Sequence, residues 1–96
     1  MNSISDIKNT LSNHRDRLFR EYSIKSLAIF GSYSRGENTD KSDLDVLVEF
    51  NGKIGIRFVD LADEIESIVG LKVDLVSRNG IKKGYLSAID TDLVYV

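Results

Sequence analysis

The amino-acid sequence predicts an α/β (α+β) fold in which a small mixed β-sheet is flanked by helices. Apolar and polar residues alternate over residues 43–50 and again over 71–76, which is the period of half-buried β-strands. Between these segments, residues 58–69 carry apolar side chains at the spacing of an amphipathic helix. A strand, a helix and a strand in this order form a βαβ unit, so we expect two parallel neighbouring strands with a right-handed crossover.

Two further elements precede this unit. Apolar side chains recur at helical spacing between Ile4 and Tyr22, so we expect one helix over roughly the first twenty residues. Ser3 and Asp6 stand three residues apart at its start, which is the spacing of a capping box. The mainly apolar run 26–30 ends at a glycine and predicts a short strand.

The same patterns predict which side chains share a surface. On the strand over 43–50, one face should carry Leu44, Val46 and Val48, and the other Asp43, Asp45 and Leu47. Gly70 should cap the helix over 58–69. The acidic side chains of that helix should lie largely in solvent: Asp60, Asp63, Glu64 and Glu66. Weaker signals favour a helix over 81–90 and an edge strand over 93–96.

The composition restricts the classes of function. The chain has 96 residues, so we expect residues 1–96 to form a single domain. It has no cysteine and only one histidine, His14, which excludes disulfides and thiolate or histidine-rich zinc sites. Short apolar runs and the lack of a signal-peptide pattern lead us to expect a cytoplasmic protein. The net charge of -2 speaks against an extended nucleic-acid surface but not against a small phosphorylated ligand.

Three aspartates are predicted to converge on one patch of the sheet. Asp43 and Asp45 stand two residues apart at a strand start, so both side chains should point to the same face. Asp74 should lie beside Asp45 if the two strands are parallel neighbours. Carboxylates this close raise one another's pKa unless a cation lies between them, and Mg²⁺ prefers such oxygen ligands. Two ions can hold the attacking and leaving oxygens of a phosphoryl displacement, with Asp74 as a candidate general base.

Each of these signals also has a plain structural explanation. An Asp-x-Asp sequence at a strand start often only caps a turn, and Asp74 taken alone is more often a solvated strand residue. A purely structural protein, however, has no reason to bring three mutually repelling acids together. The three acids combined with the glycine-rich segment that precedes them favour a functional site.

The glycine-bounded hexapeptide Gly31–Gly36 directly follows the predicted strand 26–30. Glycines let the backbone turn sharply and approach a ligand closely. Backbone N–H groups and the hydroxyls of Ser32 and Ser34 can bind phosphate oxygens there, aided by a helix N-terminus if one begins in this segment. The hexapeptide lacks the Gly-Lys-Ser/Thr of a P-loop and the Gly-x-Gly of a dinucleotide fingerprint. Taken alone, it also fits an ordinary strand-to-helix turn.

Neighbouring side chains leave alternatives open. Arg35 can bind phosphate or form a salt bridge with Glu37 or Asp40. Ser42 can cap the turn before the strand or orient the first aspartate, and capping is favoured. Tyr33 can pack against the loop or stack on a nucleobase.

Three motifs together resemble the DNA polymerase β-like nucleotidyltransferase superfamily: the hexapeptide Gly31–Gly36, Ser-Asp-Leu-Asp at 42–45 and Val-Asp-Leu at 73–75. The resemblance is closest to its small stand-alone branch, the minimal nucleotidyltransferases, and covers nearly the whole chain. It implies the nucleotidyltransferase fold, two Mg²⁺ ions and ATP as substrate. The residues implied as catalytic and metal-binding are Asp43, Asp45 and Asp74. Those implied for binding the triphosphate are Gly31, Ser32, Ser34, Arg35 and Gly36.

The resemblance also implies the reaction and the partner. A nucleoside monophosphate, expected to be AMP from ATP, would be transferred to a hydroxyl with loss of pyrophosphate. The chain is similar to the MntA-like type VII antitoxins of HEPN/MNT toxin–antitoxin pairs, so the implied acceptor is a tyrosine of a HEPN-domain toxin. Contact with membranes or directly with nucleic acid is not expected. The main alternative is a non-catalytic antitoxin that neutralises its partner by contact. A metal-dependent nuclease is disfavoured because no Glu-x-Lys follows the first aspartate.

Overall fold

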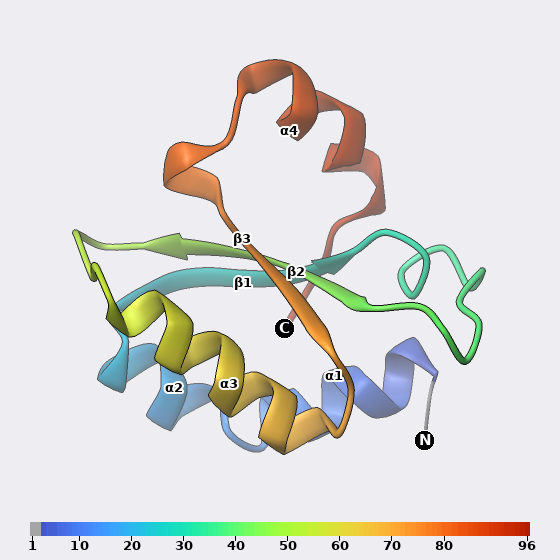
Figure 1. The fold of residues 1–96 in the computed structure, drawn as a ribbon, viewed down its shortest axis with the longest axis horizontal. Coiled ribbons are helices and arrows are strands. Elements are labelled where there is room, and N and C mark those ends of the chain that lie inside the picture. Colours follow the sequence, from blue (N-terminus) through green and yellow to red (C-terminus); the bar gives the residue numbers. More distant parts are fainter. Residues whose placement is uncertain (1–2) are drawn as a thin grey trace.

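The computed structural model describes residues 3–96. Its four strands form one mixed sheet in the order β3-β2-β1-β4. Three helices cover one face of this sheet, and the C-terminal helix arches over the other (Figure 1). The strands are β1 (Ile24–Phe30), β2 (Leu44–Phe50), β3 (Val73–Ser77) and β4 (Val94–Tyr95). The α-helices are α1 (Ile4–Ser12), α2 (Arg15–Glu21), α3 (Arg57–Val69) and α4 (Lys83–Ile89), and the short 3₁₀ turns are η1 (Arg78–Gly80) and η2 (Asp90–Asp92).

Strands β2 and β3 are parallel and are joined through α3, which confirms the predicted βαβ unit. Strand β1 runs antiparallel to both β2 and β4. The predicted strands and the two later helices are all present, with small shifts of their boundaries. Ser3 caps the start of α1, as half of the predicted capping box requires, since its hydroxyl accepts a hydrogen bond from the Asp6 N–H at 3.2 Å. Within residues 3–96, no helix is long and apolar enough to cross a membrane.

The prediction of a single N-terminal helix is wrong, because α1 and α2 are separated at Asn13 and His14. The N–H of His14 bonds to the carbonyl of Leu11, only three residues back, at 3.0 Å. Such tightened turns are frequent at helix ends, and asparagine and histidine are weak helix formers. The break changes the direction of the chain while Leu11 and Leu18 are both completely buried. The tightened turn at Asn13 and His14 therefore divides the predicted helix while both halves keep a buried leucine.

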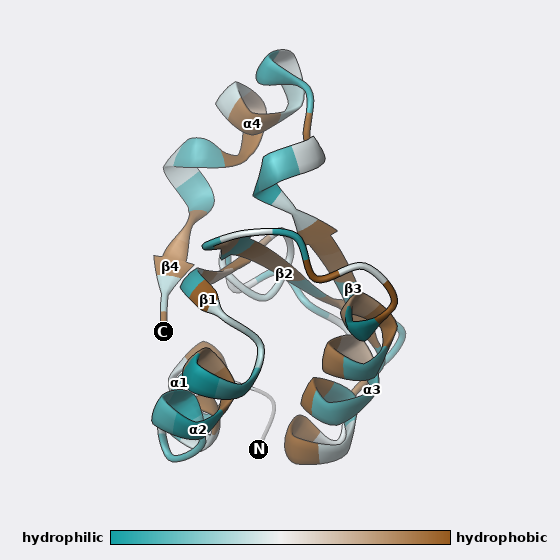
Figure 2. Ribbon diagram, turned by 90° about the vertical axis from the view of Figure 1, so that its left-hand side faces the viewer, coloured by the Kyte–Doolittle hydropathy of each residue, from teal (hydrophilic) through white to brown (hydrophobic). Residues whose placement is uncertain are grey.

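The two faces of the sheet carry separate apolar clusters. Leu44, Val46 and Val48 of β2 are completely buried on the side covered by α1, α2 and α3. Leu47 faces the opposite side and packs with Phe30. The mainly brown colour of β2 and β3 in Figure 2 marks their many apolar residues. The alternation predicted for 43–50 is confirmed.

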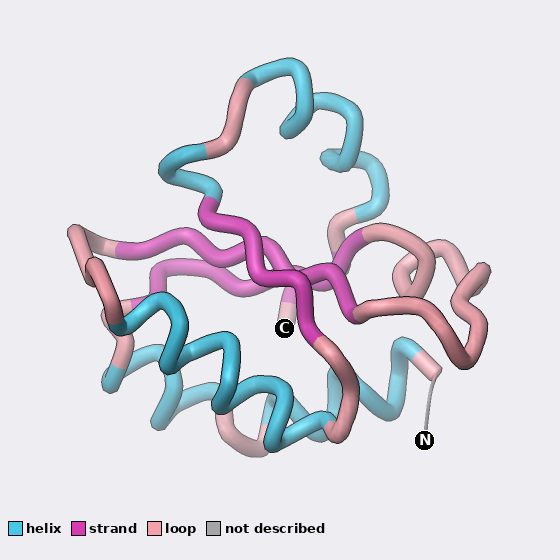
Figure 3. The backbone as a smooth tube through the Cα atoms, in the orientation of Figure 1, coloured by secondary structure: helices cyan, strands magenta, loops and turns pink. Residues whose placement is uncertain are grey.

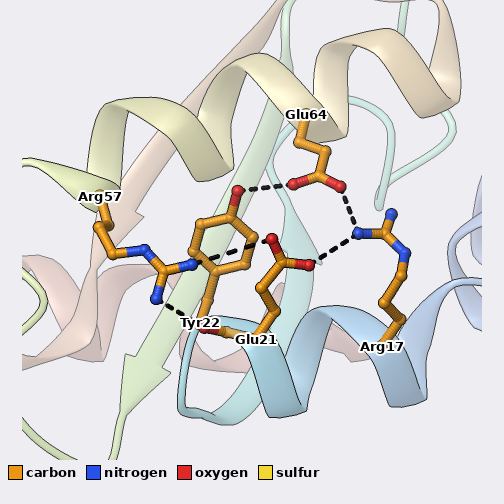
Figure 4. A network of polar contacts seen from close by, with 5 residues as sticks. All are labelled: Arg17, Glu21, Tyr22, Arg57 and Glu64. Atoms are coloured by element: carbon orange, nitrogen blue, oxygen red, sulfur yellow. Dashed lines mark hydrogen bonds and ion pairs between the residues drawn. The ribbon is translucent and has the colours of Figure 1, made fainter.

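Helix α3 is fastened to α2 by a polar network (Figure 4). Glu64 accepts a hydrogen bond from the Tyr22 hydroxyl at 2.6 Å and pairs with Arg17 at 2.5 Å. This hydrogen bond is the main reason that the pKa of Tyr22 is raised to about 12. The guanidinium of Arg57 lies 3.9 Å from the Glu21 carboxylate. The prediction that the acidic side chains of α3 lie largely in solvent is therefore wrong for Glu64, which is half-buried between two helices.

Glu66 is the second exception among these acidic side chains. Its carboxylate accepts a hydrogen bond at 2.9 Å from the N–H of Val73, the first residue of β3. Gly70 ends α3 in the left-handed conformation with φ 69°, as predicted for the helix cap. Helix α3 therefore holds the start of β3 in place directly before Asp74.

Candidate active site

Two of the three predicted aspartates lie side by side on parallel strands. In the register of β2 and β3, Asp45 is the direct partner of Asp74. Asp43 lies immediately before β2 and is exposed, as is Asp74. The parallel pairing on which the predicted convergence depended is thus present. It places the acids on the face that α4 only partly covers (Figure 1).

The glycine-rich segment begins directly against this patch. Gly31 follows Phe30, which is the register partner of Asp45 across β1 and β2. A Cβ atom added to Gly31 would lie 2.1 Å from Oδ2 of Asp45, and Gly31 has a φ of +76°. Both the contact and the backbone conformation require glycine at this position. The absence of a side chain therefore lets the loop backbone touch a carboxylate of the patch.

Turns, and no helix, connect β1 to β2 in the structure (Figure 3). The N–H groups of Arg35 and Glu37 bond back to the carbonyls of Gly31 and Ser32 at 3.1 and 2.8 Å. Gly36 closes the hexapeptide with φ +70°. A helix N-terminus is thus not available here to assist phosphate binding. Any phosphate bound to this loop would depend on free backbone N–H groups and on hydroxyls.

The loop is tied to the C-terminal segment through Asp92 of η2. The hydroxyl of Ser34 donates a hydrogen bond to the main-chain carbonyl of Asp92. Arg35 forms ion pairs with Glu37 at 2.8 Å and with the Asp92 carboxylate at 3.0 Å. Of the two salt bridges considered from the sequence, the one with Glu37 is present, and Asp92 takes the place expected for Asp40. Asp92 could not be recognised from the sequence, because 57 positions separate it from Arg35.

Other loop side chains have structural roles. Tyr33 is only 2% exposed and packs in the core beneath the sheet, so its ring is not available to stack on a base. Ser42 accepts a hydrogen bond from the N–H of Thr39 at 2.9 Å, which confirms that it caps the turn before β2. Ser32 is half-buried at the start of the loop.

The electrostatics of the patch centre on Asp45. Burial is the main cause that raises the pKa of Asp45 above its usual value of 3.8. The charges of Asp74 and then Asp43 raise this pKa further, whereas the guanidinium of Arg35 lowers it. All three acids are thus close enough to interact, and burial and the two acidic neighbours make ionisation of Asp45 less favourable. A cation held at this place would relieve both the burial penalty and the repulsion.

The donor set fits a hard divalent cation that is completed by substrate. Among residues 3–96, no three acidic, histidine or cysteine side chains are gathered closely enough to hold a metal ion by themselves. Mg²⁺ typically takes only one or two carboxylates and fills its remaining positions with waters and substrate phosphates. Asp45, Asp74 and the nearby Asp43 supply suitable oxygens. The patch therefore fits Mg²⁺ that arrives with a phosphorylated ligand better than a permanent structural metal.

Comparison with known proteins agrees with this chemistry. A family model described as a nucleotidyltransferase domain matches residues 11–95. The chain belongs to this family. A Methanocaldococcus jannaschii protein named as an inferred protein adenylyltransferase is 46% identical to this nucleotidyltransferase over 98 residues, covering 100% of both chains. The protein adenylyltransferase MntA of Thermococcus cleftensis is 33% identical over 97 residues, covering 100% of this chain and 98% of that one.

Two solved structures resemble this nucleotidyltransferase in fold. One, described as an inferred minimal nucleotidyltransferase, has a TM-score of 0.74 and 27% identity, covering 92% of this chain and 94% of that chain. The other belongs to a toxin–antitoxin crystallised with AMP-PNP, with a TM-score of 0.72 and 26% identity, covering 86% of this chain and 69% of that chain. These matches confirm the resemblance and the fold predicted from the sequence.

Proposed function

We propose that this nucleotidyltransferase transfers AMP from ATP to a tyrosine of a cognate HEPN-domain toxin in the cytoplasm and thereby acts as its antitoxin. The observation that carries the proposal is the contact between Gly31 and Asp45, with Asp74 beside Asp45 in register. It joins a loop able to bind phosphate to a patch able to bind a cation. The names of the relatives, protein adenylyltransferase and MntA, support the same reaction.

The three acids would hold Mg²⁺ at the patch, and Ser32 with the backbone N–H groups of the loop would hold the triphosphate. Bound Mg²⁺ would neutralise the phosphate charge and stabilise the charge that develops during transfer. The acceptor oxygen attacks the α-phosphorus, the bond from the α-phosphorus to the bridging oxygen breaks, and pyrophosphate leaves. Asp74, which is exposed beside Asp45, would take the proton of the acceptor hydroxyl.

A protein acceptor suits the shape of this site. Asp43 and Asp74 are exposed, so a large partner can approach them. A tyrosine hydroxyl has a pKa near 10 and needs a base during the attack. Attached AMP adds bulk and negative charge to the toxin and would repel an RNA phosphate backbone from it.

Mass spectrometry of the purified pair tests this proposal. The toxin is incubated with this protein, ATP and Mg²⁺, and its intact mass and its toxicity are measured. We expect a mass increase of one or more AMP groups together with loss of toxicity, and neither with the Asp43→Asn variant. If the Asp43→Asn protein neutralises the toxin equally well and no mass is added, the protein acts by contact alone.

A further inference from the structure

A hollow of about 530 Å³ lies beside the acid patch, between the end of β3 and the start of α4. Apolar side chains of Val76, Ile81 and Tyr85 contribute to its lining, together with Gly80 and Lys82. Tyr85 leaves 48% of its surface exposed although it is aromatic. None of these residues takes part in the site described above. The hollow is therefore an apolar surface, with an aromatic ring, that the proposed roles of the acids and the loop leave unused.

Two observations place this hollow next to the carboxylates. Val76 follows Asp74 by two residues on the same face of β3, which is about 7 Å along the strand. The ring of Tyr85 meets the ring of Phe30 edge to face, with centroids 6.5 Å apart. Phe30 is in turn the register partner of Asp45. The hollow thus borders the patch along β3 and across the sheet.

The order of the strands gives a bound nucleotide a direction. At the level of the patch, Gly31 follows β1, Asp45 lies on β2 and Asp74 lies on β3. These positions span about 10 Å across the sheet, because neighbouring strands are about 5 Å apart. The loop lies at one end of this line, and the hollow begins beside the other end, at Val76, two residues beyond Asp74 on β3. The nucleoside of a triphosphate held by the loop and the two acids is therefore within reach of the hollow.

We propose that this hollow binds the nucleobase of the nucleoside triphosphate, with the ring of Tyr85 against the base. The assignment rests on the proposed function, since it requires a triphosphate at the loop and the acids. The apolar walls of Val76 and Ile81 exclude water from a base, and an aromatic side chain can stack on any base. The volume lies within the usual range of small-ligand sites and accommodates a purine.

Two pairs of variants separate this site from general effects on the fold. Tyr85→Ala removes the ring, and Tyr95→Ala is its control, because Tyr95 is also 48% exposed but lies on β4. Gly80→Leu fills the hollow, since a Cβ at Gly80 meets no atom within 4 Å. Gly84→Leu is its control, because Gly84 has the same free space but does not line the hollow.

Calorimetry with Mg²⁺ measures the affinity of each protein for ATP and for inorganic tripolyphosphate. We expect Tyr85→Ala and Gly80→Leu to weaken ATP binding by about fivefold or more, as for loss of aromatic stacking on a base. Tripolyphosphate binding should not change, and the two control variants should bind both ligands as the wild type does. If Tyr85→Ala does not fold, Gly80→Leu decides, because it removes no packed atom.

Four results would overturn the assignment. ATP binding that is unchanged in both Tyr85→Ala and Gly80→Leu would place the base elsewhere while leaving the proposed function intact. The assignment also fails if the wild type binds ATP and tripolyphosphate equally well, or if the variants weaken the binding of both ligands alike. If the wild type binds neither ligand with Mg²⁺, the proposed function fails and this inference fails with it.

Discussion

At the scale of single residues, the chemistry of the patch follows from one carboxylate held in an unfavourable place. Asp45 lies against the backbone of Gly31 and beside Asp74, and its burial and its two acidic neighbours raise its pKa. Ionisation of Asp45, which cation binding needs, is therefore less favourable in the folded protein than for an isolated aspartate. Stability of the free protein and binding of metal with nucleotide should respond in opposite directions when this charge is removed.

The Asp45→Asn variant should lose AMP transfer, whereas its thermal stability without ligand should hold or rise at neutral pH. Folded Asp45 keeps its proton to a higher pH than the unfolded chain does, so the wild type loses stability as the pH rises above 3.8. The Asp45→Asn variant has no ionisable group at this position, so it does not undergo this loss of stability. Melting temperatures of the two proteins should therefore differ most at neutral pH and converge below pH 3.8. A marked fall in the melting temperature of Asp45→Asn at neutral pH would instead assign Asp45 a structural role.

Gly31→Ala should abolish or strongly reduce ATP binding, and Gly36→Ala is its control. Both glycines have left-handed backbones, with φ +76° and +70°, so each substitution should destabilise the fold by about 1–2 kcal/mol. Only Gly31 would bring its new Cβ against Asp45, since a Cβ at Gly36 meets no atom within 4 Å. Urea unfolding and ATP calorimetry measure the two effects separately. Equal losses of ATP binding would mean that backbone strain, and not the contact with Asp45, governs the site.

At the scale of elements, the spacing of apolar residues predicted the strands and helices well, whereas features that depend on long-range contacts could not be predicted. Alternation over 43–50 and 71–76 was enough to place Asp45 and Asp74 on one face, because a parallel βαβ unit leaves few registers that bury both strands. The break between α1 and α2 and the burial of Glu64 were missed, since both depend on packing against distant elements. The attachment of the glycine-rich loop to η2 through Asp92 was missed for the same reason.

The attachment to η2 makes Asp92 a positioning residue for the loop. Asp92→Ala should raise the KM for ATP several-fold with a smaller effect on kcat, because Arg35 loses one of its two ion pairs. The loss of stability should stay within about 1 kcal/mol, since Arg35 is substantially exposed and such pairs are weak. Asp90→Ala is the control within the same turn. Steady-state kinetics measure KM and kcat of each variant, and Asp92→Glu, which keeps the carboxylate, is the conservative variant. An unchanged KM in Asp92→Ala would show that the loop does not need this ion pair.

At the scale of the whole molecule, one face of the sheet builds the main core and the other carries the candidate site. Helices α1, α2 and α3 bury the lower face, and the acids lie on the face over which α4 arches (Figure 1). Alternate residues of the same strands form the core and carry the acids. The apolar pattern that predicted the fold therefore also predicted the position of the acids. The position of α4 over the site could not be predicted, because its short helical signal carries no information about what it covers.

Transfer of isotopic label from ATP tests the central claim most directly, because nucleotidyl and phosphoryl transfer move different phosphates. The protein, the HEPN-domain toxin proposed as its partner and Mg²⁺ are incubated with ATP labelled at the α-phosphate or, in parallel, at the γ-phosphate. We predict that the partner is labelled only from the α-position and that Asp45→Asn abolishes the labelling. Label from the γ-position, or label from the α-position that persists in Asp45→Asn, would contradict AMP transfer at the patch formed by Gly31, Asp45 and Asp74.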